Sequence, residues 1–450
     1  MVKLNFDKDF YPMITALSDY GKRVKILGGN KVTIIVERND GYNYIYSYDA
    51  LRDGVDDAYN FKIAERIIKT VLWVCGGYKI IINGSRKIYE YIKQAYTPSG
   101  IRAFDVDFMQ TVYETPFIVE YSDTIPEKKY QHAKIGGYTD GCRIGFDAGG
   151  SDRKVSAVID GKVVYSEEVV WNPKTEADPH YHYDGILSAM KTAASKMPRV
   201  DAIGVSTAGV IVADKPMVSS LFIKVDKSKY FEFVKQIYIN VGKEMGVPIS
   251  VANDGDVTAL AGSIDLNDTG VLGIAMGTSE AVGYVNKEGG LNGWISELAF
   301  MPVDFNEKAM VDEWSGDYGV GCKYFSQDAV IKLAGNAGIK FEDGLTPAQK
   351  LKIVQKMAEE GNDTALKIYQ DIGVYLAYTI PFYSIFYDIK HLLLLGRVMS
   401  GKGGNVIVET CKKTLATEFP QYKDLDISLP DENSRRVGQS IAAASLCPAK

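Results

Sequence analysis

Two short glycine-rich turns have the composition of phosphate-binding loops. Each follows an expected apolar strand, and they consist of Gly149, Gly150 and Ser151 in one case and of Gly277, Thr278 and Ser279 in the other. Asp147 stands at the end of the strand before the first turn. Because glycine has no β-carbon, backbone N–H groups in such turns can approach a phosphate closely. One loop on each side of a cleft can hold a triphosphate; two ordinary glycine hairpins are the structural alternative.

An acidic residue after a third expected strand has the chemistry of a general base. The segment PISVANDGDVTALAGS predicts a strand, then Asn253 and Asp254, then a helix that begins near Asp256 or Val257. A carboxylate at the carboxyl end of a strand facing a cleft can take a proton from a hydroxyl nucleophile. Helix capping competes for both acids. Because one cap suffices and Asp256 is better placed for it, we assign the base to Asp254.

A third glycine-rich segment, GRVMSGKG at 396–403, nearly matches the P-loop pattern GxxxxGK[ST]. It places Gly403 where a P-loop needs the hydroxyl that binds magnesium, and it has no clear partner strand ending in Asp. A glycine turn that lies against a nucleoside at the mouth of a cleft is the better interpretation.

The elements that carry these turns occur twice along the chain. Residues 143–170 predict three strands joined by two turns, and residues 271–291 repeat the first part of that plan. Each copy leads through helical segments to an apolar strand that ends in small residues, VDAIGVSTAG at 200–209 and HLLLLGRVMSGKGG at 391–404. Two α/β lobes of similar plan predict a cleft between them, where ligands usually bind.

The first 135 residues read as an α/β unit of their own. Alternation on either side of the turn at 39–41 predicts a β-hairpin. Its second strand places four tyrosines on one face: Tyr42, Tyr44, Tyr46 and Tyr48. A sheet face packed on a helix is a better interpretation of this stripe than a ligand platform. The polar run at 126–141 is the candidate linker to the rest of the chain.

Composition excludes several classes of protein. The 450 residues are 46% hydrophobic and 24% charged, which predicts two to four globular domains. A net charge of −6 without a basic cluster argues against nucleic-acid or anionic-membrane partners. Five scattered cysteines without a CxxC pair suit a reducing cytosol. The amino terminus has no apolar signal region, and the apolar stretch 374–387 is too short to span a membrane, so we expect a cytoplasmic protein.

Six motifs in a fixed order resemble the ROK family (repressors, open reading frames and sugar kinases) of the actin-like ATPase superfamily: DAGGS, VSTAG, NDGDVTALAG, MGTSEAVG, GWISELAFMPV and LLLLGRVMSGKGG. The resemblance covers about residues 141–450. It implies an α/β fold of duplicated ribonuclease-H-like lobes around an ATP and sugar cleft, plus an N-terminal α/β domain. The expected domains are 1–135, a first lobe at 141–263 on which a helix at about 434–447 packs back, and a second lobe at 264–433.

Carried over by position, the resemblance assigns ATP and Mg²⁺ to this cleft. The two turns described first correspond to the phosphate loops, and Asp147 helps to bind Mg²⁺ through water. The adenosine loop corresponds to Gly396, Gly401, Gly403 and Gly404. Asn253 matches the family's asparagine that holds a sugar hydroxyl, and Asp254 matches its base. Glu297 stands where the ExxH motif places a sugar-binding glutamate.

The chain departs from the family at several of these positions. Phe300 occupies the histidine of the ExxH motif, and Tyr324 falls where the zinc segment CxCGxxGCxE ends in a second sugar-binding glutamate. Ser315 and Asp317 replace two zinc cysteines, and only Cys322 remains. We therefore expect no structural zinc. A usual hexose loses two polar partners here, so we expect a modified or less hydroxylated sugar, or a pocket without turnover.

Two functions compete. The first is an ATP-dependent carbohydrate kinase in which Asp254 deprotonates a sugar hydroxyl that attacks the γ-phosphoryl group. The alternative is a non-catalytic sugar- or nucleotide-sensing regulatory protein whose N-terminal domain transmits closure of the cleft. Asp254 and the phosphate loops favour the kinase, whereas Phe300, Tyr324 and the extra domain favour the sensor. Both imply a small sugar or sugar derivative as partner, without nucleic acid or membrane, and a homodimer is compatible with either.

Overall fold

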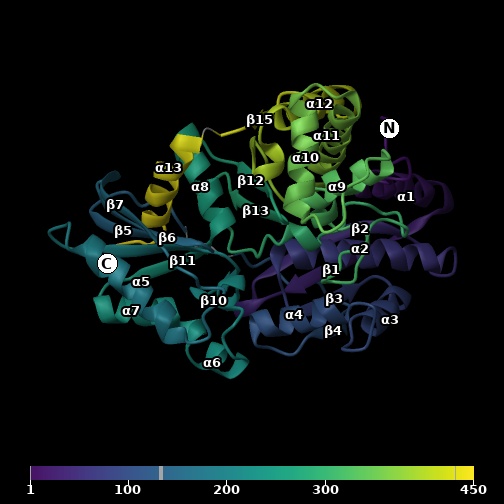
Figure 1. The fold of residues 1–450 in the computed structure, drawn as a ribbon. Helices are drawn as coiled ribbons and strands as arrows, with labels where there is room; N and C mark the ends of the chain where they lie inside the picture. Colours follow the sequence, from purple (N-terminus) through teal and green to yellow (C-terminus); the bar gives the residue numbers. More distant parts are fainter. Residues whose placement is uncertain (1, 131–134, 431, 450) are drawn as a thin grey trace.

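The computed structural model describes the chain except for residues 1, 131–134, 431 and 450, and for 432–437 it describes the backbone alone. Part of the expected linker, residues 131–134, therefore lies outside the described residues. The described chain forms an α/β fold with three larger sheets and one small two-stranded sheet (Figure 1).

The first lobe is built on a five-stranded sheet of order β11-β8-β5-β6-β7. Strands β5, β6 and β7 form an antiparallel meander, while β8 and β11 run parallel to β5. The strands are β5 (Cys142–Ala148), β6 (Asp152–Ile159), β7 (Lys162–Val170), β8 (Ala202–Thr207) and β11 (Ile249–Asn253). This order is that of a ribonuclease-H-like sheet, and it confirms the strand-turn-strand plan expected from the sequence.

The second lobe repeats most of this plan in a four-stranded sheet of order β13-β12-β14-β15. Here β12 and β13 pair antiparallel, and β14 and β15 continue parallel to β12. The strands are β12 (Val271–Met276), β13 (Glu280–Val285), β14 (His391–Leu395) and β15 (Asp426–Ser428). The counterpart of β7 is reduced to an isolated bridge between Val285 and Leu291.

Helices surround both sheets. Those of the first lobe are α5 (Pro179–Ala194), α6 (Lys227–Glu232), α7 (Ile237–Met245) and α8 (Asp254–Leu266). Those of the second part are α9 (Gln327–Asn336), α10 (Pro347–Glu359), α11 (Asp363–Tyr383), α12 (Lys402–Glu418) and α13 (Glu432–Ala444). Helix α13 returns to the first lobe, where it contacts α8 and β5. The approach is close enough that a β-carbon on Gly204 would lie 1.7 Å from the carbonyl oxygen of Ala443.

The N-terminal region forms a third sheet of order β2-β1-β3-β4. Its strands are β1 (Gly29–Glu37), β2 (Asn43–Leu51), β3 (Lys79–Asn83) and β4 (Ile118–Tyr121), and its helices are α1 (Met13–Leu27), α2 (Asp57–Cys75), α3 (Arg86–Ala95) and α4 (Ala103–Tyr113). Strands β1 and β2 pair antiparallel around a short 3-10 turn, Asn39–Gly41, which confirms the predicted hairpin.

The N-terminal region packs against both lobes. Its buried side chains belong to the same hydrophobic cluster as those of α9 to α12 and the second-lobe sheet. On β2, the rings of Tyr44 and Tyr46 pack against Phe386, which follows α11. Helix α4 also contacts the first-lobe hairpin β9 (Val210–Val212) and β10 (Lys215–Val218), and Glu114 at its end pairs with Lys235 at 2.7 Å. The tyrosine stripe is thus largely a packing face.

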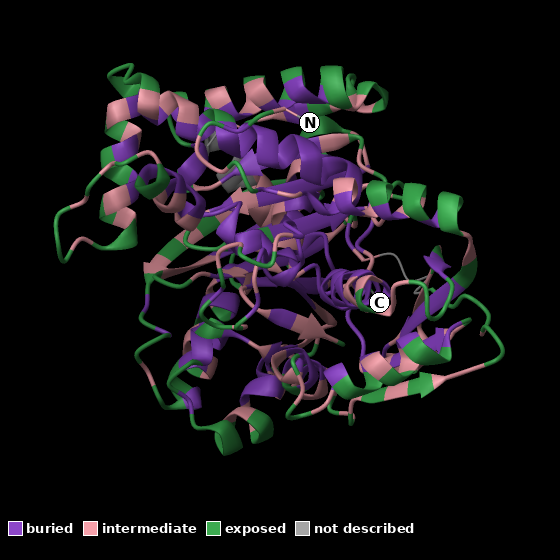
Figure 2. Cartoon of the chain, turned by 90° about the vertical axis from the view of Figure 1, so that its right-hand side faces the viewer, coloured by how far each residue is buried: buried purple, intermediate pink, exposed green. Residues whose placement is uncertain are grey.

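Burial follows this arrangement (Figure 2). The central strands and the inner faces of the helices are buried, whereas the edge strands β7 and β4 and the outer sides of the helices are partly exposed. Helix α11 is buried throughout from Asp371 to Tyr383, with Pro381 in its last turn. Within the described residues, no helix has the length and apolar character needed to cross a membrane.

Candidate functional site

The site centres on the N-terminus of α8, directly after β11. Asn253 is the N-cap: its Oδ1 accepts from the N–H of Gly255 at 2.7 Å, and its Nδ2 donates to the carbonyl oxygen of Gly209 at 2.9 Å. The assignment of the cap to Asp256 was therefore wrong, as was the expected helix start near Asp256 or Val257. The helix begins at Asp254 because the side chain of Asn253, the residue before it, accepts from the N–H of Gly255, which has no partner within the helix.

The first glycine turn and Asp254 lie around one cavity of about 200 Å³. Asp147, Gly149 and Gly150 line it from the first lobe, and Gly273, Ala275 and Ala281 line it from the second. The indole N–H of the buried Trp171 donates to the carbonyl oxygen of Gly149 at 2.8 Å and holds the turn. The backbone N–H groups of Gly150 and Ser151 donate to no acceptor in the described part of the chain. Free N–H groups in a glycine turn suit an anion such as phosphate.

Two carboxylates face this cavity without a basic partner. Among the described residues, neither Asp147 nor Asp254 forms an ion pair, and Asp147 accepts only from the hydroxyl of Ser206, at 2.7 Å. Burial raises the pKa of Asp147 despite that hydrogen bond. Burial and then the charge of Asp147 raise the pKa of Asp254, whereas the N–H of Gly255 opposes the rise. Mutual repulsion between two such carboxylates is relieved by a divalent cation, so the donor set fits Mg²⁺.

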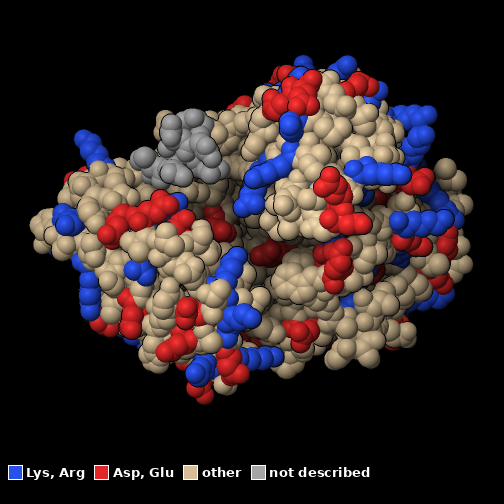
Figure 3. Space-filling model, viewed as in Figure 1, with Lys and Arg blue, Asp and Glu red and all other residues tan. Residues whose placement is uncertain are grey.

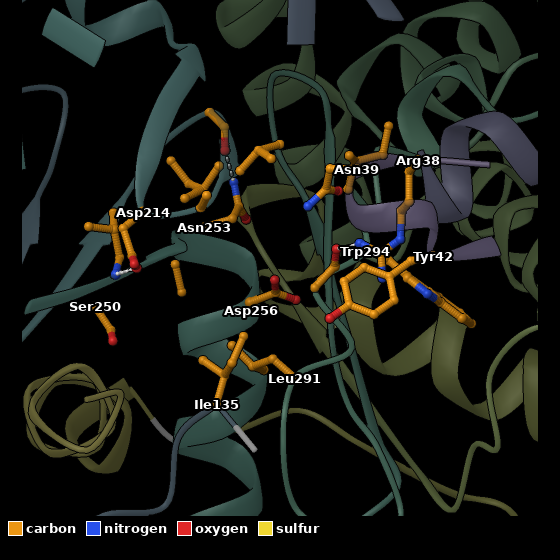
Figure 4. A pocket seen from close by; sticks show the side chains of 18 of the residues that line it. Arg38, Asn39, Tyr42, Ile135, Asp214, Ser250, Asn253, Asp256, Leu291 and Trp294 are labelled. Atoms are coloured by element: carbon orange, nitrogen blue, oxygen red, sulfur yellow. Dashed lines mark hydrogen bonds between the residues drawn. The ribbon is translucent and has the colours of Figure 1, made fainter. Parts of the chain in front are cut away.

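A second cavity of about 300 Å³ lies on the other side of Asn253. It is lined by residues of the N-terminal hairpin, of the first lobe and of the segment after β13. The side chains labelled in Figure 4 include Arg38, Asn39, Tyr42, Asp214, Asn253, Asp256 and Trp294. Figure 3 shows the hollow between the lobes, with acidic side chains at its floor.

The two cavities are lined by adjacent residues of the chain, which form a wall between them. Ala208 and Asp254 line the smaller cavity, while their chain neighbours Gly209 and Asn253 line the larger one. The hydrogen bond from Asn253 to Gly209 joins the two segments of this wall. Asp254 therefore belongs to this wall and faces the smaller cavity, while Asn253 and Asp256 face the larger one.

Two further acids lie close to Asp254. Asp256 accepts from the N–H of Tyr284 at 3.2 Å. Burial, reinforced by the charge of Asp254, raises the pKa of Asp256 to about 7. Burial, followed by the charges of Asp254 and Asp256, also raises the pKa of Glu297 to about 7. Glu297 thus lies near Asp254 and Asp256 but lines neither of the two cavities, and its own N–H donates to the carbonyl oxygen of Trp73 in α2 at 2.9 Å.

The other expected nucleotide residues occupy separate positions. The turn Gly277–Ser279 caps the β12–β13 hairpin outside the 200 Å³ cavity, and Thr278 and Ser279 are exposed. Gly396 lines a cavity of about 290 Å³ with Leu395, which also lines the cavity at Asp147. Gly401 is the N-cap of α12, and Gly403 and Gly404 form its first turn. Gly403 packs so closely that a β-carbon would lie 2.6 Å from the ring of Tyr369.

The two aromatic residues that replace family ligands serve as packing contacts. Phe300 lies against Trp73 of α2, with Phe104 and Phe108 of α4 completing the cluster. Tyr324 donates its hydroxyl to Asp304 at 2.7 Å and contacts Phe10 near the start of the chain. Both positions are therefore covered by the N-terminal region.

The segment around Asp317, which corresponds to the family's zinc site, is held in place by buried ion pairs. Asp317 pairs with Arg66 at 3.0 Å, Lys69 at 3.3 Å and Arg102 at 2.8 Å, all of them buried. Burial opposes ionisation, but the charges of Lys69, Arg66 and Arg102 hold the pKa of Asp317 well below its usual range. Three cations around this carboxylate repel a metal ion, so the residues present do not fit zinc. Within the described residues there is no cluster of three metal-ligating side chains.

Comparison with known proteins decides the family. The ROK family model matches residues 143–444, which is about two thirds of the chain. The chain belongs to the ROK family. A ROK hexokinase from Thermus thermophilus is similar in structure, with 15% identity and a TM-score of 0.51 over 67% of this chain and 97% of that one. A ROK family transcriptional regulator, a homologue of the E. coli Mlc protein, has 16% identity and a TM-score of 0.51 over 68% of this chain and 78% of that one.

No curated protein matches the chain by sequence. At these identities the two structures establish the fold, which is the duplicated actin-like ATPase fold expected from the motifs. The family includes sugar kinases and non-enzymatic repressors. The ROK core of this chain corresponds to the two lobes, and the N-terminal α/β region is additional to it.

Sequence reasoning missed part of the larger cavity. Asp256 was assigned to helix capping, and Asn39, Tyr42, Asp214 and Trp294 were not identified as site residues. A turn sequence of Asn-Asp-Gly followed by Tyr carries polar and aromatic groups suited to a ligand. Nothing local in the sequence indicates that this turn reaches the cleft of the ROK core.

Proposed function

We propose that the protein is an ATP-dependent carbohydrate kinase that transfers the γ-phosphoryl group to a sugar hydroxyl. The observation that carries this proposal is the position of Asp254, at the wall between the cavity of the glycine turn and the larger cavity beside Asn253. A phosphoryl donor in the first cavity and a hydroxyl acceptor in the second meet at this carboxylate. ROK membership and the fold shared with a ROK hexokinase support the proposal.

In this mechanism Asp254 is the general base. Its carboxylate accepts the hydroxyl proton as the sugar oxygen bonds to the γ-phosphorus and the bond to the bridging oxygen of ADP breaks. Its raised pKa brings it nearer to neutral pH, where a base is most effective. Asn253 is fixed by its two hydrogen bonds and holds the wall in place beside the acceptor.

The remaining cleft residues bind the donor. The free N–H groups of Gly150 and Ser151 bind phosphate oxygens, and the cavity at Gly396 takes the nucleoside, since it adjoins the phosphate cavity at Leu395. Asp147 would help to hold Mg²⁺, which supplies positive charge to the transferring phosphoryl group, and Asp254 stays free to accept the proton.

The proposal is tested by measuring ADP release with Mg-ATP in the presence of glucose, N-acetylglucosamine, glucosamine or glucuronate. We expect sugar-dependent ADP release above the rate with ATP alone, and a phosphorylated sugar in the products. Isothermal titration that detects no binding of ATP or ADP at millimolar concentration contradicts the proposal.

One observation favours a second function, that of a sugar-sensing regulatory protein. The N-terminal region contacts the second lobe through Phe300 and the first lobe through α4, so it touches both sides of the cleft. A change in the angle between the lobes must alter one of these contacts. Sugar binding without phosphoryl transfer would support the sensor.

A further inference from the structure

We propose that the N-terminal hairpin turn forms one wall of the sugar pocket, and that Asn39 and Tyr42 bind the acceptor. This inference rests on the proposed function for the identity of the ligand. It assigns to the N-terminal region a direct part in substrate recognition, in a site completed by the ROK core.

The cavity geometry places the turn opposite the residues of the ROK core. Figure 4 shows the side chains of Asn39 and Tyr42 entering from one side, with Asn253 and Asp256 on the other. Ile135 and Leu291 provide an apolar floor. The volume of about 300 Å³ is that of a pocket for one small molecule. A ligand in this space contacts both parts of the chain.

The turn offers polar groups that the protein itself leaves unused. Within the described residues, the Tyr42 hydroxyl has no hydrogen-bond partner, and the Oδ1 of Asn39 is buried without one. The Nδ2 of Asn39 donates only to the neighbouring Asp40, at 3.0 Å. A buried acceptor without a partner is costly, and a sugar hydroxyl that reaches this amide removes the cost. The Tyr42 ring adds an apolar face with a polar end.

Arg38 fixes the turn to the rest of the pocket. Its side chain is 7% exposed and donates to the carbonyl oxygens of Gly293 and, at 3.4 Å, of Asn292. The same guanidinium lies 5.4 Å from the centre of the Tyr42 ring. Trp294 directly follows these two carbonyl groups in the chain. Arg38 therefore holds the Tyr42 ring beside the segment that carries Trp294. Arg38 is a positioning residue, with its donors directed to the backbone.

The turn replaces polar groups that the core has lost. By the resemblance to the family motifs, Phe300 and Tyr324 stand at two sugar-binding positions, and both side chains pack against the N-terminal region here. The same region brings Asn39 and Tyr42 to the cleft. The packing of the N-terminal region on the ROK core therefore both covers Phe300 and Tyr324 and places the hairpin turn at the sugar pocket.

The charge of the pocket selects the class of acceptor. Among the described residues that line it there are three carboxylates, those of Asp40, Asp214 and Asp256, and one cation, that of Arg38, which is directed to backbone carbonyls. An anionic sugar such as a uronate meets repulsion from these acids. The acceptor class is a neutral or amine-bearing monosaccharide.

The test compares Asn39→Ala and Tyr42→Phe with a matched control, Tyr46→Phe. Tyr46 lies on the same hairpin, and its hydroxyl is outside the pocket. Affinity for glucose, N-acetylglucosamine, glucosamine and glucuronate is measured by titration, alongside ATP affinity and thermal melting. Each pocket variant should weaken binding of the preferred sugar roughly 3- to 10-fold, as expected for one hydrogen bond, with ATP affinity unchanged. The control should bind like the wild type, and glucuronate should bind most weakly.

The outcomes separate this inference from the proposed function. Unchanged sugar affinity in both pocket variants, with phosphoryl transfer intact, overturns the inference and leaves the kinase standing. Sugar binding that the variants weaken, without phosphoryl transfer in the wild type, supports the inference and overturns the kinase. Failure of all four sugars to bind overturns both, and preferential binding of glucuronate overturns the acceptor class.

Discussion

The ring of Phe300 lies 4.5 Å from the ring of Trp73, measured between centroids, and this contact joins the ROK core to helix α2. Both side chains are buried. In the family motif the position of Phe300 is a histidine, and here it anchors an additional region of the chain. Phe300 therefore links the ROK core to the N-terminal region.

Replacing Phe300 with Ala should therefore reduce stability. Removal of a fully packed aromatic ring costs about 3–5 kcal/mol in the free energy of unfolding, because a cavity remains. Denaturant titration measures this, with Phe231→Ala as control; Phe231 is 41% exposed and its loss should cost less than about 1 kcal/mol. An unchanged free energy of unfolding with weakened sugar binding would show instead that Phe300 contacts the ligand.

Asp317→Asn should also be strongly destabilising. The change leaves Arg66, Lys69 and Arg102 buried around a neutral side chain, and breaking such a network by removing one partner costs about 3–5 kcal/mol. The matched control is Asp363→Asn, which removes an exposed pair with Lys367 and should cost less than about 1 kcal/mol. Equal unfolding midpoints for the two variants would contradict the importance of this network.

Metal removal should leave stability unchanged. The segment around Asp317 is held by ion pairs rather than by thiolates, so treatment with a chelator should not lower the melting temperature. Metal analysis of tag-free protein should find no stoichiometric zinc. One equivalent of zinc in the protein, and a lower melting temperature once a chelator removes it, would contradict this prediction.

The stability of the protein should fall with rising pH in a way that depends on Glu280. Burial raises the pKa of this carboxyl to about 8, while a hydrogen bond from Tyr383 opposes the rise. The folded state then holds the proton more tightly than the unfolded state, so this stabilisation is complete below about pH 4.5 and is lost as the pH rises to about 8.

Glu280→Gln removes this titration. Between pH 6 and pH 8.5 the wild type should lose roughly 1–3 kcal/mol more of its free energy of unfolding than the variant does. Denaturant titrations at the two pH values measure the difference. Parallel losses in the two proteins would show that Glu280 has no raised pKa.

Much of the fold could be predicted because its signals are local. Glycine turns after apolar strands identified the duplicated lobes and placed Asp147 and Asp254 at strand ends. The helix start was wrong because two acids and one amide competed within four residues, and only the hydrogen bond that Asn253 accepts from the N–H of Gly255 decides between them. The role of the N-terminal turn could not be predicted, because it depends on packing between residues more than 200 positions apart, such as Arg38 and Gly293.

The central claim is tested most directly by Asp254→Asn, assayed for phosphoryl transfer to whichever sugar supports turnover. The amide keeps the size of the side chain but cannot accept the hydroxyl proton, so the rate should fall by a factor of ~10² to 10⁴. ATP affinity and melting temperature should stay close to those of the wild type, because Asn253, and not Asp254, caps the helix. A variant that retains most of the wild-type rate would show that Asp254 is not the base and that the kinase mechanism at this site is wrong.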